Sequence, residues 1–469
     1  MKNLRITSNS LIEKKRISIL LGIMALTIVL QLYNLGNKSL WLDEAWSFKF
    51  ASMNLVEILA SPDKPNPPLY YAILHFFLEF GKSEFIMRLP SVIFSVLCIP
   101  LAYKIGMDLF NCRVGLLNAF LLATSPFFYW MAQEARSYTL FTFFSLLSLI
   151  FFYNALRGNN LLLWIGYVLS ISLGIYTHYF ASFLILIEFL FMILYFKQYK
   201  AVFSSFLLSL IAILLLILPQ IMSFFTGMSL KLDEGAVWGM PPSSSFVPSI
   251  FINLSIGQGY PWLFVALPFF IFLYGLYNSY IDNKEAFWLS VIWIFMPILI
   301  SFLLAFKINI DVRYFIFILP IYLAVISRGF IVIRRKRAAF FITVFLIFCI
   351  FNSCLLYENY DKPKEDWRSV GSMIKDSSSP GDCIISIPGG ILEPCLSYYD
   401  INSSMIIDVY PEDEADSRTE VQRILLKTRR SWIPYSDHIG DTKNILLNWL
   451  NLNCIKRGDF YGTKVYLCE

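Results

Sequence analysis

Charged residues are scarce in this chain, and their scarcity excludes an ordinary soluble protein. Only 15% of the 469 residues are charged, whereas 57% are hydrophobic, and the mean hydropathy is +0.62. Soluble domains have about 25% charged residues. The composition therefore predicts a polytopic membrane protein.

Three other patterns are missing. The net charge is +5, but the sequence has no stripe of basic residues interleaved with aromatic residues, so we expect no nucleic acid partner. The spacing of the cysteines does not resemble a zinc site. The first apolar run has a basic flank but no small-residue cleavage pattern before Asn37, which predicts a retained anchor and not a removed signal peptide.

Long apolar runs are present throughout the first three quarters of the chain. A helix needs about 20 apolar residues to cross about 30 Å of hydrocarbon, and about eleven runs approach that length. The predicted fold is mainly α: a polytopic transmembrane helix bundle. The runs are 17–35, 89–109, 114–131, 138–156, 161–176, 181–196, 203–225, 261–280, 286–306, 314–333 and 338–357.

Basic residues collect at one end of these runs. The N-terminal arm and the links after the even-numbered runs carry them, as in the cluster Arg334-Arg335-Lys336-Arg337. Because cytoplasmic loops are enriched in Lys and Arg, we predict a cytoplasmic N-terminus and an extracytoplasmic C-terminal segment. The expected location is the cell membrane, with many passes.

This topology sorts the polar motifs onto the outer face. Asp43 and Glu44 follow the first run between tryptophans, and acids beside hydrocarbon persist mainly when they pair, bind a cation or handle a proton. Arg136 and Arg313 lie at the outer ends of predicted membrane helices, where the positive-inside rule disfavours basic residues. We therefore expect each of them to have a charged or polar partner. The simpler interpretations are an interfacial acidic loop and arginines that reach lipid headgroups.

Two loops and a tail complete the predicted organisation. Residues 1–357 form the membrane domain, in which the first outer loop, 36–88, has interfacial helices around Leu55–Leu59 and Leu69–Phe80. The outer loop 226–260 is a lid or a plain connector. Residues 358–469 form a small extracytoplasmic α/β domain, with strands expected at 383–387, 405–409 and 464–467. Its cysteines, Cys383, Cys395, Cys454 and Cys468, suggest two disulfides with three possible pairings.

Five short motifs occur in a fixed order along the chain. They are Leu42-Asp43-Glu44, Asn66-Pro67-Pro68-Leu69-Tyr70-Tyr71, Arg88-Leu89-Pro90, Gln133-Glu134-Ala135-Arg136-Ser137-Tyr138, and Arg313-Tyr314 with Pro320. In this order, the motifs resemble the C-type glycosyltransferase superfamily, in the branch of protein O-mannosyltransferases and the lipid A aminoarabinose transferase. The chain departs from this pattern at Asn66, where many relatives have histidine or lysine.

The resemblance implies an enzyme that transfers a sugar from a polyprenyl-phosphate carrier to an acceptor glycan, lipid or protein at the outer membrane surface, with inversion. A base must deprotonate the acceptor and cations must stabilise the departing phosphate. The expected base is Asp43, with Glu44 and Glu134 as helpers, and the expected phosphate-binding residues are Arg136, Arg313 and, more weakly, Arg88. The expected pocket residues are Asn66, Tyr70, Tyr138, His178 and Tyr314.

No cofactor follows from the sequence with certainty. A divalent cation stays open, because His178 and an acid could hold one, although a lone interfacial histidine is more often a hydrogen-bonding residue. Two other functions also stay open. A transporter or flippase would have charges near the middle of the membrane, internal repeats or broken helices in matching halves, and none of these is clear in the sequence. A non-catalytic receptor would bind its ligand through the outer domain.

Overall fold

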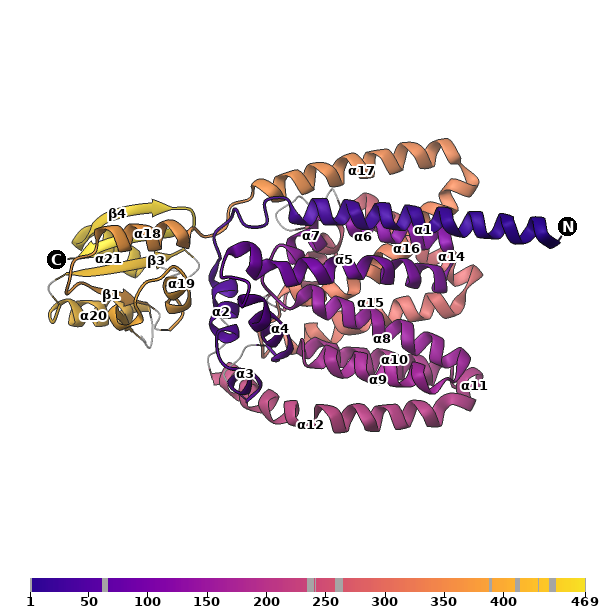
Figure 1. Cartoon of the computed structure of the whole chain (residues 1–469), viewed down its shortest axis with the longest axis horizontal. Coiled ribbons are helices and arrows are strands. Elements are labelled where there is room, and N and C mark those ends of the chain that lie inside the picture. The colour runs from indigo at the N-terminus through magenta and orange to yellow at the C-terminus, as the bar shows by residue number, and fades with distance from the viewer. Residues whose placement is uncertain are drawn as a thin grey trace. The chain divides into compact units, whose positions relative to one another are not determined.

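The computed structural model describes residues 2–60, 66–233, 240, 242–257, 265–387, 390–409, 414–428, 430–437 and 444–468. Its contacts divide the chain into two compact units, drawn in Figure 1. The helical unit contains Met1–Tyr33, Leu59–Tyr70 and Leu89–Tyr360. The mixed unit contains Asn34–Ile58, Tyr71–Arg88 and Asp361–Glu469, so much of the first loop is grouped with the C-terminal segment.

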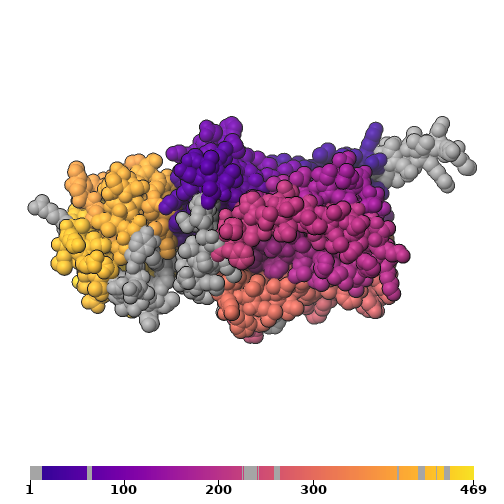
Figure 2. Space-filling view, turned by 90° about the horizontal axis from the view of Figure 1, so that it is seen from below, coloured from indigo at the N-terminus to yellow at the C-terminus, as the bar shows by residue number. Residues whose placement is uncertain are grey.

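The helical unit is built almost entirely from apolar helices. Figure 2 shows one face of it, formed largely by the middle of the chain. In α12 (Phe203–Asp233), Leu208, Leu214 and Leu215 are each more than half exposed. The elements are α1 (Lys2–Leu32), α5 (Glu84–Leu109, whose first turn belongs to the mixed unit), α6 (Cys112–Ala123), α7 (Pro126–Ala132), α8 (Tyr138–Gly158), α9 (Leu161–Ile175), η1 (Tyr179–Ala181), α10 (Ser182–Leu194), α11 (Phe196–Tyr199), η2 (Lys200–Val202), α12 (Phe203–Asp233), α13 (Phe246–Ile256), α14 (Ala266–Asp282), α15 (Lys284–Leu304), η4 (Val312–Ile318), α16 (Leu319–Lys336) and α17 (Ala338–Asp361).

The helix lengths confirm a polytopic membrane protein but give fewer full spans than the sequence suggested. Among the described residues, seven helices are long and apolar enough to cross a membrane, or eight if the bent pair α6 and α7 counts as one span. Each of the eleven predicted runs overlaps a helix, although residues 261–264 of one run lie outside the described residues. The count differs because α9, α10 and α14 have only 15, 13 and 17 residues, fewer than the roughly 20 that a perpendicular crossing needs, and because the run 114–131 is divided between α6 and α7.

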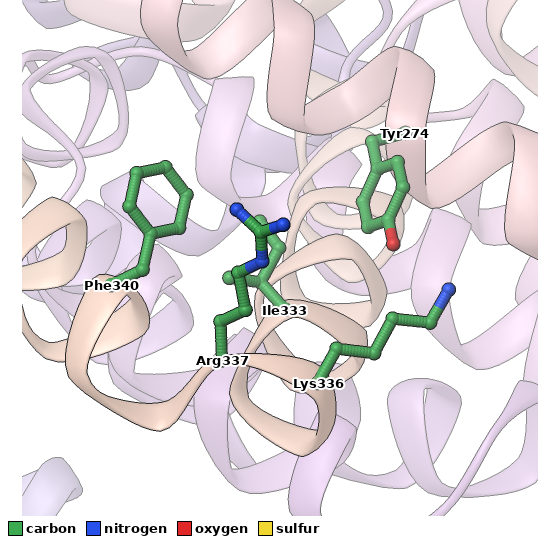
Figure 3. Close-up of a pocket in the computed structure, with 5 residues that line it drawn as sticks. All are labelled: Tyr274, Ile333, Lys336, Arg337 and Phe340. Atoms are coloured by element: carbon green, nitrogen blue, oxygen red, sulfur yellow. The ribbon is translucent and has the colours of Figure 1, made fainter.

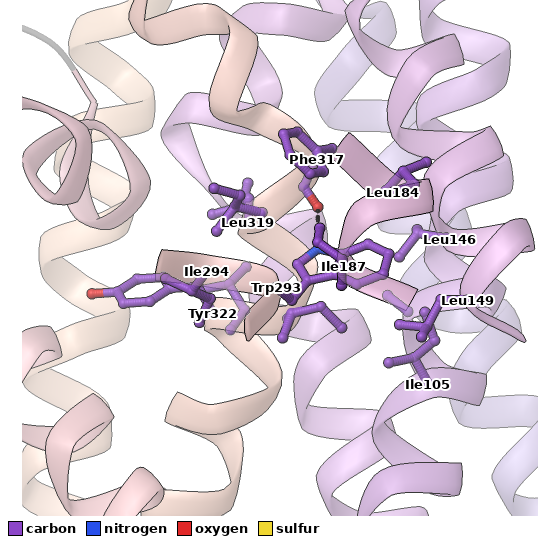
Figure 4. Packing of buried hydrophobic residues seen from close by; sticks show 14 of the residues in the cluster. Ile105, Leu146, Leu149, Leu184, Ile187, Trp293, Ile294, Phe317, Leu319 and Tyr322 are labelled. Atoms are coloured by element: carbon purple, nitrogen blue, oxygen red, sulfur yellow. Dashed lines mark hydrogen bonds between the residues drawn. The ribbon is translucent and has the colours of Figure 1, made fainter. Parts of the chain in front are cut away.

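Large apolar side chains from distant segments fill the centre of the helical unit. Trp293 of α15 is fully buried, and its indole Nε1 donates a hydrogen bond to the carbonyl oxygen of Phe317 at 3.3 Å (Figure 4). This bond gives the buried indole the partner it needs. At Gly275 of α14 and Gly329 of α16, an added Cβ would collide with backbone of the other helix, so these glycines allow the two helices to pack closely.

A sharp bend separates α6 from α7. The two helices differ in direction by 58°. Pro126 begins α7, where its missing N–H costs nothing, and the Ser125 side chain accepts a hydrogen bond from the backbone N–H of Phe128. The bend brings the short α7 to the turn 133–137 that precedes α8.

The loop expected at 226–260 contains more regular structure than the sequence suggested. Helix α12 continues to Asp233, and the apolar run Phe246–Ile256 forms α13, with Phe246, Ile250 and Leu254 buried. The serines and prolines before the run had favoured a loop. Residues 234–239, 241 and 258–260 of this segment lie outside the described residues.

The mixed unit combines short helices with a five-stranded sheet. The strand order is β2-β1-β3-β5-β4, with β1 parallel to β2 and β3, and β5 antiparallel to β3 and β4. Its elements are α2 (Leu42–Ala51), α3 (Leu55–Ala60), α4 (Leu69–Leu78), α18 (Trp367–Ser377), β1 (Cys383–Ser386), α19 (Glu393–Tyr398), η5 (Ser403–Met405), β2 (Ile406–Asp408), α20 (Glu414–Leu425), β3 (Ser431–Ser436), α21 (Ile445–Asn453), β4 (Ile455–Phe460) and β5 (Thr463–Cys468), of which the end of α3 and the start of α4 belong to the helical unit.

Only one of the two disulfides expected in this segment is formed. Cys454, after α21, is bonded to Cys468, at the end of β5. Cys383 and Cys395 are free thiols. The Cys383 sulfur instead lies 3.0 Å from the Ser431 hydroxyl of the neighbouring strand.

Candidate functional site

The turn between α7 and α8 places two charged side chains inside the helical unit. Glu134 and Arg136 are only 2% and 7% exposed. The turn is held by the Arg136 backbone N–H, which donates to the carbonyl oxygen of Glu134 at 2.8 Å. The Trp130 indole N–H donates to Glu134 Oε1 at 2.8 Å, which orients the carboxylate. Burial of charge at this level requires partners or a function.

Arg313 is fixed by the residue that begins its own helix. Asp311 caps η4, because its side chain accepts a hydrogen bond from the Arg313 backbone N–H, and its other oxygen lies 2.8 Å from Arg313 Nη2. Arg313 Nη1 lies 3.9 Å from Glu134 Oε2, and the guanidinium carbon lies 5.7 Å from the centre of the Tyr138 ring. Segments almost 180 residues apart thus form one charged cluster.

Aromatic rings flank this cluster. His178 lies with its ring centre 5.0 Å from that of Tyr314 and 6.1 Å from that of Tyr138, and it stacks on Phe141 at 5.0 Å. His178 Nδ1 accepts a hydrogen bond from the backbone N–H of Phe180 at 3.2 Å. A neutral ring with this acceptor carries its proton on Nε2.

A hydrogen-bonded chain connects the start of α4 to the same turn. The Tyr70 hydroxyl lies 2.8 Å from the Ser91 hydroxyl, which donates to the carbonyl oxygen of Arg136 at 3.1 Å. The backbone N–H of Leu69 donates to the carbonyl oxygen of Tyr176 at 2.9 Å. Asn66, half-buried, lies three residues before α4.

Glu44 and Arg88 form a buried ion pair in the mixed unit. Their side chains are 0% and 1% exposed, and Arg88 Nε and Nη2 lie 2.7 and 2.8 Å from the two carboxylate oxygens of Glu44. The remaining guanidinium donors reach the carbonyl oxygens of Leu35, Lys38 and Ser39. All five N–H donors of this guanidinium are therefore engaged.

Additional positive charge surrounds the pair. Lys364 Nζ lies 3.1 Å from Glu44 Oε2. Burial, together with the positive charges of Lys364 and Arg88, lowers the pKa of Lys38 to about 8. Burial is the largest of these causes, so the low pKa reflects mainly the loss of solvent around the Lys38 ammonium group.

The helix that carries Asp43 is built into the core of the mixed unit. Asp43 is in the first turn of α2 and partly exposed, while Ala45 packs in one hydrophobic cluster with Trp367 and Leu396. Farther along α2, Lys49 Nζ lies 2.8 Å from Glu393 of α19. The C-terminal segment therefore positions the Asp43 helix.

The structure thus gathers one part of the expected site and leaves the other as a prediction. Within the helical unit, the turn 133–138, Arg313, His178 and Tyr314 lie together. The supporting partners Asp311, Trp130, Ser91 and Lys364 were not among the expected site residues. Asp43, Glu44 and Arg88 belong to the mixed unit, so a common site with the arginines stays a prediction.

The described residues also bear on a metal site. Among them, no group of three or more His, Cys, Asp and Glu side chains is placed to hold a metal ion. His178 Nδ1 is already an acceptor for a backbone N–H. We assign no metal site and derive no step through a metal.

Comparison with known proteins identifies the architecture. The family model described as dolichyl-phosphate-mannose-protein mannosyltransferase matches residues 63–222. ArnT from Cupriavidus metallidurans, solved in the apo state, has a TM-score of 0.64 and 13% identity, over 95% of this chain and 97% of that one. The chain has the fold of ArnT.

Two other solved structures with this fold extend the comparison. The archaeal oligosaccharyltransferase AglB from Archaeoglobus fulgidus, in complex with an inhibitory peptide and a dolichol-phosphate, has a TM-score of 0.61 and 12% identity, over 90% of this chain and 69% of that one. Mycobacterial arabinofuranosyltransferase AftD has a TM-score of 0.55 and 12% identity, over 95% of this chain and 39% of that one. No curated protein matches the chain in sequence.

The family-model match covers only some of the candidate residues. Residues 63–222 include the turn with Glu134 and Arg136, and also His178. Asp43 and Arg313 lie outside it. The assignment of these two residues therefore depends on the motifs and on the contacts described above.

Proposed function

We propose that this protein is a membrane glycosyltransferase that moves a sugar from a polyprenyl-phosphate carrier to an acceptor hydroxyl at the extracytoplasmic face, with inversion. ArnT from Cupriavidus metallidurans has also been solved with undecaprenyl phosphate bound, and AglB with a dolichol-phosphate. These related structures support a lipid-phosphate donor for this chain. The acceptor is a hydroxyl of a glycan, a lipid or a protein.

In the proposed reaction, the Asp43 carboxylate takes the proton of the acceptor hydroxyl. The acceptor oxygen then forms a bond to the anomeric carbon, and the bond from that carbon to the phosphate oxygen breaks. The lipid phosphate leaves with the bonding electron pair. Arg136 and Arg313 stabilise its negative charge, because a guanidinium remains charged and binds phosphate oxygens with two N–H groups.

The observation that carries this proposal is the charged cluster of Glu134, Arg136 and Arg313 at one end of a glycosyltransferase bundle. In this cluster Asp311 fixes the Arg313 guanidinium at 2.8 Å, and Glu134, whose carboxylate is oriented by Trp130, adds a negative charge 3.9 Å from it. A fixed guanidinium stabilises a developing charge without reorganising during the reaction.

Glu44 and Arg88 have a different task in the proposal. Because all five donors of Arg88 are engaged, we assign it to bracing the Asp43 helix together with Glu44, in place of the phosphate contact first expected. Tyr70, Tyr138, His178 and Tyr314 form the polar and aromatic wall against which donor and acceptor bind.

The test is a transfer assay with purified protein, a panel of polyprenyl-phosphate sugars and a competent acceptor. Asp43→Asn keeps the shape of the side chain but removes the base, so turnover should fall about a hundredfold or more, while donor binding changes little. Arg313→Gln should weaken both donor binding and turnover. Glu57→Gln, in the same loop, is the control and should retain activity. Full activity of Asp43→Asn would remove Asp43 as the base.

One buried group favours transport as a second candidate function. Glu188, in the middle of α10, is fully buried within the helical unit, and carboxyl groups inside membrane bundles often mark ion or substrate paths. Reconstitution in liposomes tests this alternative. Movement of a lipid-linked sugar across the bilayer without any transfer would replace the enzyme with a flippase.

A further inference from the structure

A cavity opens at the end of the helical unit opposite the charged cluster. Its volume is about 390 Å³, and it is lined by Tyr274 of α14, Ile333 and Lys336 of α16, Arg337, and Phe340 of α17 (Figure 3). Helix α16 begins directly after η4, which carries Arg313, and ends at Lys336. At 1.5 Å per residue, these 18 residues separate the cavity from the cluster by about 27 Å.

The charged residues that line the cavity are both cationic. Lys336 and Arg337 supply two positive charges. Figure 3 shows the Lys336 side chain extending below the Tyr274 ring and the Arg337 guanidinium between the rings of Phe340 and Tyr274. Lys336 Nζ lies 5.9 Å from the centre of that ring. Across the part of the chain that the structure describes, neither cation forms an ion pair with a carboxylate.

Two acids at this end of the unit, Asp282 and Glu285, are paired with arginines outside the cavity. Asp282, which ends α14, forms an ion pair with Arg328. Glu285, at the start of α15, lies 3.1 Å from Arg157. The cavity therefore presents positive charge with no carboxylate in its lining, which suits an anionic ligand.

The surface that continues from the cavity is apolar. Along α17, Phe340, Ile342, Leu346 and Ile350 are each more than half exposed. Residues of this kind face hydrocarbon when the helix crosses a membrane. A ligand that matches both parts has an anionic head and long apolar chains.

We propose that this cavity binds the phosphate headgroup of an anionic phospholipid, whose acyl chains lie along α17. The Arg337 guanidinium and the Lys336 ammonium bind the phosphate oxygens, while Tyr274 and Phe340 flank the head. A cavity of this size is within the range of small-molecule sites. On the topology predicted from the basic residues, the lipid belongs to the cytoplasmic leaflet, where basic pockets between helices bind anionic headgroups.

The experiment measures lipid binding to the full-length protein in nanodiscs of phosphatidylcholine with increasing phosphatidylglycerol. Native mass spectrometry counts the retained lipids, and thermal scans record stabilisation. The double variant Lys336→Gln with Arg337→Gln should weaken phosphatidylglycerol binding about tenfold or more. The matched control, Arg113→Gln with Lys197→Gln, removes two exposed basic charges from other links and should change binding less than twofold.

A second variant keeps the charges and removes the space. Ile333→Trp fills the cavity and should reduce phosphatidylglycerol binding as strongly as the double variant, so the test holds even if one protein folds poorly. Equal binding by both variants and the wild type would overturn the proposal. So would inorganic phosphate that stabilises the protein as well as phosphatidylglycerol does, because the site would then take a free anion.

Discussion

Glu44→Gln should destabilise the mixed unit far more than the same change at an exposed pair. The variant leaves Arg88 and Lys364 next to a neutral group in a site where Glu44 is fully buried. Removing one charge of a buried pair costs about 3–5 kcal/mol. We expect the lower end, about 3 kcal/mol, because the glutamine oxygen still accepts a hydrogen bond from Arg88.

This free energy converts to a measurable change in melting temperature. For a unit of this size, 1 kcal/mol corresponds to roughly 2–4 °C, so the apparent Tm should fall by about 6–12 °C. Thermal scans of the detergent-purified protein, followed by tryptophan fluorescence, provide the assay. Trp367 and Trp432 report on the core of the mixed unit.

The control is Glu420→Gln, at a partly exposed ion pair with Arg423. Exposed pairs contribute about 0–1 kcal/mol, so this variant should change the Tm by no more than about 4 °C. Arg88→Met should be worse than Glu44→Gln, because it also leaves the carbonyl oxygens of Leu35 and Ser39 without their donor. Equal shifts for Glu44→Gln and Glu420→Gln would refute the reasoning.

Three further predictions follow from other parts of the chain. The pKa of Lys38 is lower in the folded protein than in the unfolded chain, so protonated Lys38 destabilises the fold below about pH 8. This destabilisation is lost as the pH rises toward the pKa of Lys38 in the unfolded chain. Lys38→Gln should therefore raise the Tm at pH 7, with a gain that shrinks at about pH 9. Cys454→Ala opens a loop closed by a disulfide with a sequence separation of 14, which should cost about 3 kcal/mol, whereas Cys383→Ser should change the Tm little. Glu188→Gln should leave sugar transfer nearly unchanged if the protein is a transferase, and a loss of lipid movement in liposomes would favour transport.

The sequence predicted the membrane fold because each helix carries its own apolar run. The small C-terminal sheet was harder to predict. Strand β3 contains Pro434, a residue that usually ends a strand, and β4 contains Lys456, Arg457 and Asp459, so neither has the alternating apolar pattern of a strand. The strands β1, β2 and β5 were predicted, since their runs of Ile, Val and Tyr are typical of buried strands.

The candidate site, too, could be predicted from the sequence only in part. Arg136 and Arg313 could be selected because a basic residue at an apolar helix mouth is unusual on the predicted outer side. The Asp311 partner could have been found, since an acid two residues before Arg313 is typical of a helix cap. Lys364 could not, because it contacts Glu44 across 320 positions of sequence and no local pattern encodes that contact.

The most direct test of the central claim is a cryo-EM structure of the full-length protein with a polyprenyl phosphate. If Asp43 and the arginines form one site, the phosphate will lie against the Arg136 and Arg313 guanidinium groups, with the Asp43 carboxylate within about 15 Å of them, close enough for side-chain motion to bring it to a bound sugar. A phosphate bound away from both arginines, or Asp43 farther than this from both, would contradict the account.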